Sequence, residues 1–472
     1  MNRYALTCAQ TRAEEERAFA AGVSPLLLME HAAEKIVDQL EALLGGCSGK
    51  RVLFACGSGN NGGDGLAAAR LFAARGGLPS ILLPIPPATV QGQAQLNFAR
   101  YLHLPVLQTP PEGSFDGAVD ALFGIGLNRA PTGALAEAID YLNTLDAPVL
   151  AVDVPSGMNG DTGRTEGACV HADRTVSCHA VKTGLLLTPH PEWVGVWTVA
   201  DIGLPPAKCG LPYYEADDLP GLLPPRAPHA HKGLCGRVLV YGGSEGKAGA
   251  AAMCALAALK GGAGLVTVAC SPALFPILQT LVPNAMCAPL SGAAALPRDV
   301  LAAGCGIGQS EAARQALLSL LPDTHKMVLD ADGLNLLAQA PFDLPPATVL
   351  TPHPLEAARL LQKPLGDVLA APLESAHALC SRYGCTVVLK NAVSVIAAPD
   401  GRVALNVLTA PSLAKGGSGD ALCGLLAATL CEMDDPFEAA RIACLRLSVA
   451  GRKGAEKYGV RGLLTCEMAA LL

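Results

Sequence analysis

The chain has 472 residues, more than one hydrophobic core usually serves, so two domains are expected. Its residues are 51% hydrophobic and only 16% charged, with 51 glycines, a composition that suits an α/β protein with many glycine turns. The net charge of −7, without basic clusters, excludes nucleic acid as the main partner, because the phosphate backbone is bound by concentrated lysine and arginine.

The N-terminal sequence and the cysteines predict a soluble cytoplasmic protein. The first residues, MNRYALTCAQTRAEEER, are acidic where a signal peptide needs an apolar core. The longest uncharged stretch, residues 261–297, is interrupted by several prolines, so we expect no membrane span. The 17 cysteines form no CxxC pair and lie in apolar surroundings, which favours buried free thiols in a reducing compartment.

In the N-terminal half, β-branched apolar runs alternate with helical patterns, as in the βα units of a parallel sheet. In RVLFACGSGNNGGDGLAAARLFAARG, residues 51–76, a strand, a glycine loop and a helix follow directly, and another unit begins at Val149. The loop at 57–65 allows close backbone approach to a phosphate and by itself indicates only a generic nucleotide site. The oxygen donors of Asn61, Asp120 and Ser156 would suit a hard monovalent cation.

Between about residues 204 and 228 the sequence becomes rich in proline and loses clear periodicity. We place the domain boundary there, with domains at 1–210 and 211–472. Further βα units begin at Arg237 and Met327, and residues 389–406 predict two strands joined by a Pro-Asp-Gly turn.

The run Gly416-Gly417-Ser418-Gly419-Asp420 precedes the apolar stretch ALCGLLAATL and predicts an anion site that contains a base. Small residues let backbone N–H groups converge on a negative oxygen, and the following helix adds its positive N-terminal end. Asp420 would accept a proton from a substrate hydroxyl while the amides hold a phosphoryl group. The alternative is a tight strand-to-helix turn in which Asp420 only caps the helix.

Motifs in both halves resemble known families. The C-terminal half contains HKGLCGRVLVYGGS, GCGIG, VLDADGLNLL, TPHPLEAARLL and VVLKNAVSVIAAPDGRVALN before the GGSGD run, and resembles ADP/ATP-dependent NAD(P)H-hydrate dehydratases, a branch of the ribokinase-like fold. The N-terminal half contains GVSPLLLMEHAA, GSGNNGGDG, VDALFGIGLNR and AVDVPSGMNGDTG, and resembles NAD(P)H-hydrate epimerases. The fused pair therefore resembles the bacterial family of bifunctional NAD(P)H-hydrate repair enzymes.

The resemblance implies an α/β fold of two three-layer αβα domains, an N-terminal Rossmann-like epimerase domain and a C-terminal ribokinase-like dehydratase domain. The first would interconvert the R and S epimers of NAD(P)HX, acting as an isomerase. The second, a lyase, would use ADP to dehydrate (6S)-NAD(P)HX to NAD(P)H, releasing AMP and phosphate.

For the N-terminal site, the resemblance implies potassium as the cation at Asn61, Asp120 and Ser156. It implies that Asp153 lies beside the nicotinamide ring as the acid/base, whereas the alternative is a helix or turn cap. His31 stands where the family usually shows asparagine, and packing or capping is an equally good interpretation of it. The implied dinucleotide contacts are Asn60, Asn61, Gly62, Gly63, Asp64, Gly124, Ile125, Gly126, Leu127, Asn128, Arg129, Ala130 and Asp153.

For the C-terminal site, the resemblance implies Asp420 as the catalytic base and magnesium bound with the nucleotide. Asp330 and Asp332 could orient that magnesium or have a structural role at a strand end. The implied hydrate contacts are Gly308, His353 and Asp420. The implied nucleotide contacts are Lys390, Asn391, Ala392, Val393, Ser394, Gly416, Gly417, Ser418 and Gly419.

Two other functions stay open at this point. The C-terminal half could be a ribokinase-like kinase of a vitamin-precursor alcohol, which would release a stable phosphate ester. The N-terminal half could be a catalytically silent nucleotide-binding module, because fold alone does not determine function. The sequence does not choose between ADP and ATP, between NADHX and NADPHX, or between a monomer and a homo-oligomer.

Overall fold

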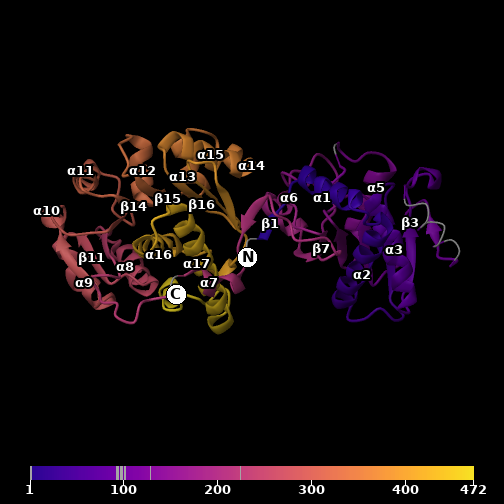
Figure 1. Cartoon of the computed structure of the whole chain (residues 1–472), viewed down its shortest axis with the longest axis horizontal. Helices are drawn as coiled ribbons and strands as arrows, with labels where there is room; N and C mark the ends of the chain where they lie inside the picture. The colour runs from indigo at the N-terminus through magenta and orange to yellow at the C-terminus, as the bar shows by residue number, and fades with distance from the viewer. Residues whose placement is uncertain (1–2, 92–94, 96–98, 100–101, 128, 224) are drawn as a thin grey trace. The chain divides into compact units, whose positions relative to one another are not determined.

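The computed structural model describes residues 3–91, 95, 99, 102–127, 129–223 and 225–472. The described chain divides into two compact units, Arg3–Pro212 and Tyr213–Leu472, each with its own hydrophobic core (Figure 1). The α/β class predicted from the sequence is confirmed in both units.

The sheet of the N-terminal unit is parallel throughout and has the order β4-β3-β2-β5-β6-β7-β8. The strands that follow β1 (Arg3–Ala5) are β2 (Arg51–Cys56), β3 (Leu78–Leu82), β4 (Val106–Leu107), β5 (Gly117–Ala121), β6 (Val149–Val152), β7 (Arg174–Cys178) and β8 (Val196–Ala200). The central strands are buried on both faces, which explains their continuous apolar runs.

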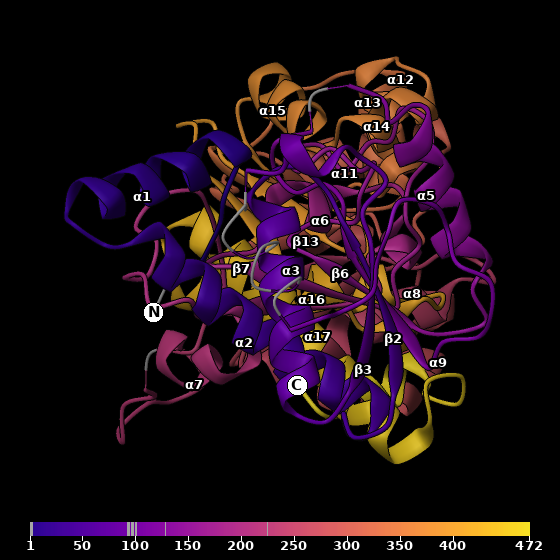
Figure 2. The same cartoon turned by 90° about the vertical axis from the view of Figure 1, so that its right-hand side faces the viewer.

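Side chains of β2 alternate between two apolar layers. Val52, Phe54 and Cys56 pack with α2 (Pro25–Leu44) and α3 (Asn60–Ala74), whereas Leu53 and Ala55 pack with α5 (Ala134–Thr144). Because successive side chains of a strand point to opposite faces, one strand serves both helical layers. Figure 2 shows α2 and α3 on one side of the sheet and α5 on the other, the predicted three-layer αβα arrangement.

The remaining helical segments of this unit are short or lie beside the sheet. They are α1 (Cys8–Ala20), α6 (Thr183–Leu187) and the 3-10 turns η1 (Pro87–Thr89) and η2 (Pro191–Trp193). The N-terminus of α1 is closed by a capping box in which the Thr7 hydroxyl accepts a hydrogen bond from the Gln10 backbone N–H.

The C-terminal unit contains a larger sheet. From one side its strands run β18-β17-β16-β15-β14-β13-β10-β11-β12, and Tyr213 of β9 (Leu211–Tyr213) pairs with Leu405 of β18. The strands are β10 (Arg237–Tyr241), β11 (Leu265–Cys270), β12 (Met286–Pro289), β13 (Val300–Ala303), β14 (Lys326–Leu329), β15 (Ala347–Leu350), β16 (Thr386–Leu389), β17 (Ser394–Ala397) and β18 (Val403–Asn406). The sheet is parallel from β12 to β16, and β17 and β18 form the predicted antiparallel hairpin.

Helices cover both faces of this sheet. Figure 1 shows α11–α15 on the opposite side from α8, α16 and α17. The helices of the unit are α7 (Leu219–Leu222), α8 (Ala248–Gly261), α9 (Phe275–Leu281), α10 (Leu290–Ala293), α11 (Glu311–Leu320), α12 (Asp332–Gln339), α13 (Pro354–Leu361), α14 (Leu365–Ala370), α15 (Pro372–Tyr383), α16 (Ser418–Glu432), α17 (Pro436–Tyr458) and α18 (Thr465–Ala469). Three 3-10 turns join them: η3 (Ala216–Asp218), η4 (Pro272–Leu274) and η5 (Pro411–Leu413).

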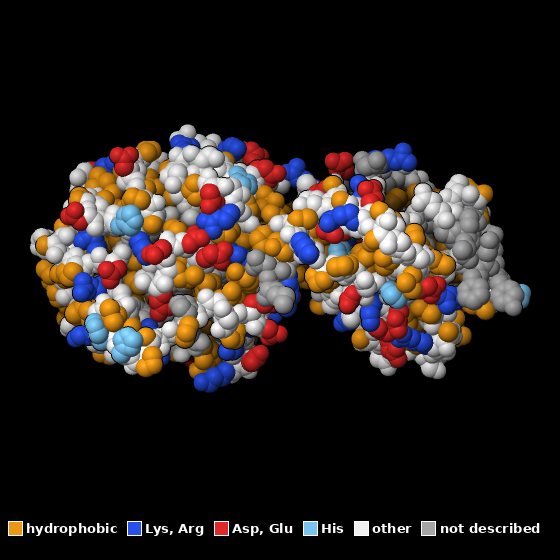
Figure 3. Space-filling model, in the orientation of Figure 1, with side chains coloured by type: hydrophobic (Ala, Val, Ile, Leu, Met, Phe, Trp, Pro, Cys, Tyr) orange, Lys and Arg blue, Asp and Glu red, His pale blue; other side chains and the backbone are white. Residues whose placement is uncertain are grey.

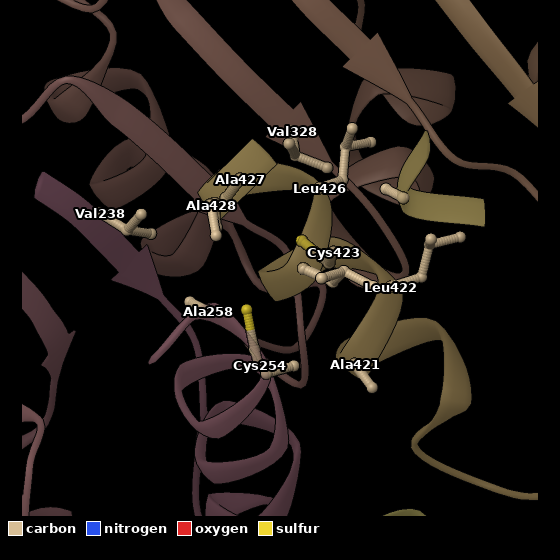
Figure 4. Close-up of a cluster of buried hydrophobic side chains, with 14 of the residues drawn as sticks. Val238, Cys254, Ala258, Val328, Ala421, Leu422, Cys423, Leu426, Ala427 and Ala428 are labelled. Atoms are coloured by element: carbon tan, nitrogen blue, oxygen red, sulfur yellow. The ribbon is translucent and has the colours of Figure 1, made fainter. Parts of the chain in front are cut away.

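The closest helix packing in this unit is that of α8 against α16. A side chain at Gly424 would overlap the backbone carbonyl of Cys254, so glycine allows the two backbones to meet. Small and apolar residues of both helices, with Val238 and Val328 from the sheet, form the core drawn in Figure 4. This packing fixes the position of α16, whose first turn contains Asp420.

The surface has a mixed charge distribution. On the face shown in Figure 3, lysine and arginine side chains are interspersed with aspartate and glutamate. In the described part of the chain, no helix is both long and apolar enough to cross a membrane. All 17 cysteines are free thiols, and most of them are buried.

We expect Gly424→Ala to destabilise the C-terminal unit by about 1–3 kcal/mol, because the added methyl group forces α8 and α16 apart. Hydrogen exchange of peptides from these helices in urea measures the change. Gly366→Ala in α14 is the matched control, since nothing lies within 4 Å of the added methyl group. The tryptophans, Trp193 and Trp197, lie in the N-terminal unit, so fluorescence should remain unchanged. Equal protection in both variants would contradict this assignment.

Candidate active sites

A cavity of about 550 Å³ opens in the N-terminal unit where β2, β5 and β6 end. Ligands of parallel α/β sheets bind beyond the carboxyl ends of the strands, where loops and helix N-termini converge. Many residues implied by the family resemblance line this cavity: Asn60, Asn61, Asp64, Gly124, Ile125, Gly126, Leu127, Arg129, Ala130 and Asp153.

Two residues of the glycine loop have a packing position instead. Gly62 and Gly63 are buried in the first turn of α3 and do not line the cavity. A side chain at Gly62 would overlap the carbonyl of Gly57, so this glycine allows α3 to begin directly against the loop. Asn128 lies outside the described residues.

Asp153 is held in a constrained position just after β6. Its φ of 68° is in the left-handed region, which is uncommon for residues other than glycine. Its Oδ1 accepts hydrogen bonds from Lys182 Nζ at 2.5 Å and from the Cys178 backbone N–H at 3.2 Å. The Lys182 side chain is fully buried and also donates to the carbonyl of Cys178 at 2.7 Å. The carboxylate is therefore oriented by these hydrogen bonds and lines the cavity.

Other acids surround this ion pair. Burial raises the pKa of Asp64 well above its usual range, and the charges of Asp153 and Glu15 raise it further. Burial also raises the pKa of Glu15. The charge of Lys182 acts in the opposite direction on both groups, but it does not cancel the effect of burial. The cavity holds both a paired carboxylate and a carboxyl group able to donate a proton.

Asp120 and Ser156 are bonded to each other beneath the cavity. The Ser156 hydroxyl donates to Asp120 Oδ1 at 2.6 Å, and the Ser156 backbone N–H donates to Oδ2 at 2.7 Å. Burial raises the pKa of Asp120 to about 6, although these hydrogen bonds lower it. The Ser156 hydroxyl oxygen also accepts from the Phe123 backbone N–H at 2.8 Å. Asp120 is completely buried and does not line the cavity.

The donor set fits a hard cation. Asn61 Nδ2 is buried without a hydrogen-bond partner. If the Asn61 side-chain amide is rotated by half a turn, Oδ1 takes the position of Nδ2. Together with Asp120 and Ser156 it would supply the amide, carboxylate and hydroxyl oxygens that hard cations take.

His31 lies on α2, away from the cavity lining. Its Nδ1 bonds the carbonyl oxygen of Ile202 at 2.9 Å. This bond connects the segment after β8 to α2. The contacts of His31 are therefore those of a packing residue.

The C-terminal unit has a cavity of about 500 Å³ between the start of α16 and the β16–β18 region. The implied nucleotide contacts that line it are Lys390, Asn391, Ala392, Ser394, Ser418 and Gly419, whereas Val393, Gly416 and Gly417 do not. Gly417 is the N-cap of α16, and its φ of 94° lets the chain turn into the helix. Asp420 follows in the first turn, where the helix dipole favours negative charge.

Asp330 and Lys390 form a buried ion pair beside this turn. Lys390 Nζ donates to Asp330 Oδ1 at 2.7 Å, and Asp330 is 1% exposed. An added Cβ at Gly419 would lie 3.1 Å from Asp330 Oδ2 and 3.3 Å from Lys390 Nζ, so glycine lets the turn approach the pair. Lys390 is thus bonded at a strand end rather than solvated.

Asp332 holds the loop that contains Gly308. Its Oδ2 accepts from the Gly308 backbone N–H at 2.9 Å and from Lys247 Nζ at 3.2 Å. Asp332 therefore has a structural contact at the strand end, one of the two roles expected for it. No atom lies within 4 Å of an added Cβ on Gly308, so space is open beside this residue.

His353 is the N-cap of α13. Its Nδ1 accepts from the backbone N–H groups of Leu355 and Glu356 at 3.1 and 3.3 Å, and Glu356 bonds back to the His353 N–H at 2.8 Å. Burial lowers the pKa of His353, which keeps the capping nitrogen unprotonated. The histidine side chain is still 46% exposed, and its Nε2 lies 3.4 Å from Glu356 Oε1. Glu356, with its pKa raised to about 7 by burial, was not foreseen from the sequence.

Asp420 is poised for proton transfer. Burial raises its pKa to about 6, and the neighbouring charge of Asp330 adds to this effect. A hydrogen bond with Cys305 and the charge of Lys390 act in the opposite direction. A carboxylate with a pKa close to the working pH is an effective general base.

The sequence did not indicate Lys182 or Cys305 as site residues. Lys182 stands in the apolar run HAVKTGLLL, where a charged residue is a signal of burial with a partner. Cys305 is the second residue of GCGIG, and its distance from Asp420 along the chain hides their proximity.

Family models match both units. Residues 238–472 match the model described as NAD(P)H-hydrate dehydratase, and residues 26–184 match the model described as YjeF-related protein N-terminus. A crystal structure of the Bacillus subtilis ADP/ATP-dependent NAD(P)H-hydrate dehydratase, co-crystallised with ATP and Mg²⁺, is similar with a TM-score of 0.52 and 28% identity. That similarity covers 56% of this chain and 97% of the other.

Full-length relatives share the arrangement. A bifunctional NAD(P)H-hydrate repair enzyme from Escherichia coli is 36% identical over 98% of this chain and 91% of its own length. A protein of the same name from Coxiella burnetii is 36% identical over 97% of this chain and 96% of its own length. The chain belongs to the family of bifunctional NAD(P)H-hydrate repair enzymes.

Proposed function

We propose that this protein restores hydrated nicotinamide cofactors through two activities. Residues 1–210 epimerise R and S NAD(P)HX, and residues 211–472 dehydrate the S epimer with ADP, releasing NAD(P)H, AMP and phosphate. The observation that carries the proposal is an oriented carboxylate in each unit, Asp153 beside one cavity and Asp420 in the helix turn beside the other. The free thiols support a reducing, cytoplasmic location.

In the N-terminal unit, Asp153 moves a proton at the C6 hydroxyl of the reduced pyridine ring as the C–O bond opens and closes on the other face. The hydrogen bond from Lys182 orients the Asp153 carboxylate. The loop Gly124–Ala130 and the start of α3 bind the dinucleotide. A potassium ion held by Asn61, Asp120 and Ser156 would supply positive charge for the phosphate groups.

In the C-terminal unit, Asp420 accepts the proton of the substrate hydroxyl while that oxygen takes the terminal phosphoryl group of ADP. Electrons of the ring nitrogen then expel phosphate, which is a better leaving group than hydroxide, and loss of a proton from C5 of the resulting iminium ion restores the dihydropyridine. Backbone N–H groups of Gly416–Gly419 stabilise the charge of the transferred group. Gly308 and His353 bind the hydrate, and the nucleotide binds along Lys390–Ser394.

Magnesium would accompany the nucleotide. Carboxylate oxygens of Asp330 and Asp420 lie within 4.8 Å of each other, and hard oxygen donors suit that ion. Bound there with the phosphates, it would neutralise their charge.

The function is tested by incubating the pure protein with mixed R and S NADHX, ADP and Mg²⁺ while the absorbance of the dihydronicotinamide is followed. Full recovery of NADH from both epimers is expected. Recovery of only one epimer would mean that the N-terminal unit is a silent binding module. Accumulation of a stable phosphate ester, without NADH, would favour the vitamin kinase.

We expect Asp420→Asn to lower the dehydratase kcat by about 100-fold or more, since the base that accepts the hydroxyl proton is lost. Epimerisation, followed by chromatography of the two epimers, should continue at the wild-type rate. Loss of both activities together would show that the carboxylate supports the whole protein rather than one reaction.

The dehydratase should lose activity as the pH falls through about 6, because a raised pKa means that Asp420 becomes protonated there. An unperturbed aspartate would lose activity only near pH 3.9. The kcat/KM of dehydration from pH 5 to 8, with (6S)-NADHX as the substrate, measures this. A flat profile down to pH 5 would contradict the role of Asp420.

We expect Asp153→Asn to abolish enzymatic epimerisation, because the amide cannot take up a proton and leaves Lys182 without its ionic partner. Dehydration of the pure S epimer should be retained. His31→Gln, outside the cavity, is the control and should epimerise normally. Rapid exchange of epimers in Asp153→Asn would remove Asp153 from the mechanism.

A further inference from the structure

Three cysteine thiols meet beside the C-terminal site. Cys254 lies on α8, Cys305 in the turn after β13, and Cys423 on α16. Their sulfur atoms all lie within 4.8 Å of one another, and each residue is 0% exposed. Figure 4 shows Cys254 and Cys423 among the small apolar side chains between the two helices. We call these three residues the thiol cluster.

The backbone packing holds the thiol cluster together. Glycine at position 424 brings the backbone of α16 against the carbonyl of Cys254, which places Cys423 beside α8. Cys305 enters from the sheet, where the loop after β13 turns through Gly304 and Gly306 at positive φ. Because these backbones are fixed by the core, the three thiols converge without a disulfide between them.

The thiol cluster reaches the reacting carboxylate. The Cys305 sulfur and carboxylate oxygens of Asp330 and Asp420 also lie within 4.8 Å of one another. Asp420 is partly exposed, so it connects the buried sulfurs with the opening of the site. An ion entering the site would meet a carboxylate first and then three thiols.

We propose that the thiol cluster binds one thiophilic divalent cation of the zinc and cadmium class, and that the Asp420 carboxylate, which lies within 4.8 Å of the Cys305 sulfur, moves in as the fourth ligand. Zinc–sulfur bonds of about 2.3 Å separate tetrahedral sulfur ligands by roughly 3.8 Å, so the thiols need only small shifts to bind it. Thiolates select such soft ions over magnesium, which takes oxygen ligands. On binding, the three thiol protons pass to solvent.

A divalent ion compensates part of the charge of these ligands. Three thiolates, the Asp420 carboxylate and one dication carry a net charge of −2, and the nearby Lys390 ammonium is paired with Asp330 at 2.7 Å. A disulfide would use only two of the thiols and would leave the third, together with Asp420, without a role.

The consequence is a metal-dependent block of one activity. This step rests on the proposed role of Asp420 as base: a carboxylate that ligates a cation no longer accepts the substrate proton. The dehydratase stops when the ion binds and resumes when the ion is removed. The epimerase site, in the other unit, contains none of these ligands.

Binding is tested with cadmium alone on the full-length protein, in which the exposed Cys209 and Cys466 are replaced by serine. We expect one equivalent of cadmium to bind with the ultraviolet charge-transfer band of three thiolates. Mutating a residue that only supports a metal ligand lowers the metal affinity by roughly 10- to 100-fold, so loss of a thiolate ligand should weaken cadmium binding by at least that much. Cys254→Ala and Cys423→Ala should both show this loss.

The control is Cys380→Ala, which removes an equally buried thiol on α15 outside the thiol cluster. It should bind cadmium as the parent does, and thermal unfolding of each variant reports whether it is folded. If a thiol-cluster variant unfolds, the serine replacement at the same position takes its place. Equal cadmium binding in parent and cluster variants would overturn the proposal, as would mass spectrometry showing a disulfide between two cluster thiols in place of bound metal.

Measurements of dehydratase activity distinguish this inference from the proposed function. Zinc should inhibit dehydration of (6S)-NADHX by tenfold or more, and a chelator selective for zinc over magnesium should restore the rate. Cys254→Ala should resist zinc relative to its own metal-free rate. Cadmium binding without any dehydratase activity in the metal-free protein would overturn the proposed function alone. Full activity without cadmium binding would overturn the metal site alone.

Discussion

A buried lysine–aspartate ion pair beyond the end of a parallel strand organises each site of this protein. Asp153 follows β6 and is bonded by Lys182, which lies 29 positions later in the sequence. Asp330 follows β14 and is bonded by Lys390, which lies 60 positions later. Removing one partner of a buried pair leaves an unpaired charge, at about 3–5 kcal/mol. The pairs therefore fix the loops that carry them, and the cavities open beside them.

The acids around each site fall into two kinds. Asp153 and Asp330 are bonded by a lysine, whereas burial without a lysine partner raises the pKa of Asp64, Asp120 and Asp420. Groups of both kinds side by side are what proton transfer at neutral pH requires. Desolvation of the carboxylates without a lysine partner lowers the stability of the folded protein at high pH. It also raises their pKa values toward neutral pH, where a carboxyl group can exchange a proton.

Close backbone packing makes the floor of the C-terminal site rigid. The approach of α16 to α8 at Gly424 and of the turn to Asp330 at Gly419 leaves no room for larger residues. As a result, Asp420 is fixed by the core of the unit rather than by a flexible loop. The thiol cluster is a further product of this packing, because one cysteine from each helix meets Cys305 from the turn after β13.

By itself, the sequence determined the α/β class, the βα units at residues 51, 149 and 237, the β17–β18 hairpin and the helix start at the GGSGD run, because periodicity and turn chemistry are local signals. It also indicated part of the lining of the two cavities, through motifs at the ends of strands. Only the tertiary structure showed that Gly62 packs against Gly57 and that His353 caps a helix. It also showed that Lys182 lies beside Asp153 and that Cys305 lies beside Asp420. These facts depend on which segments a parallel sheet brings together, and contacts between residues far apart in the chain leave no periodic trace in its sequence.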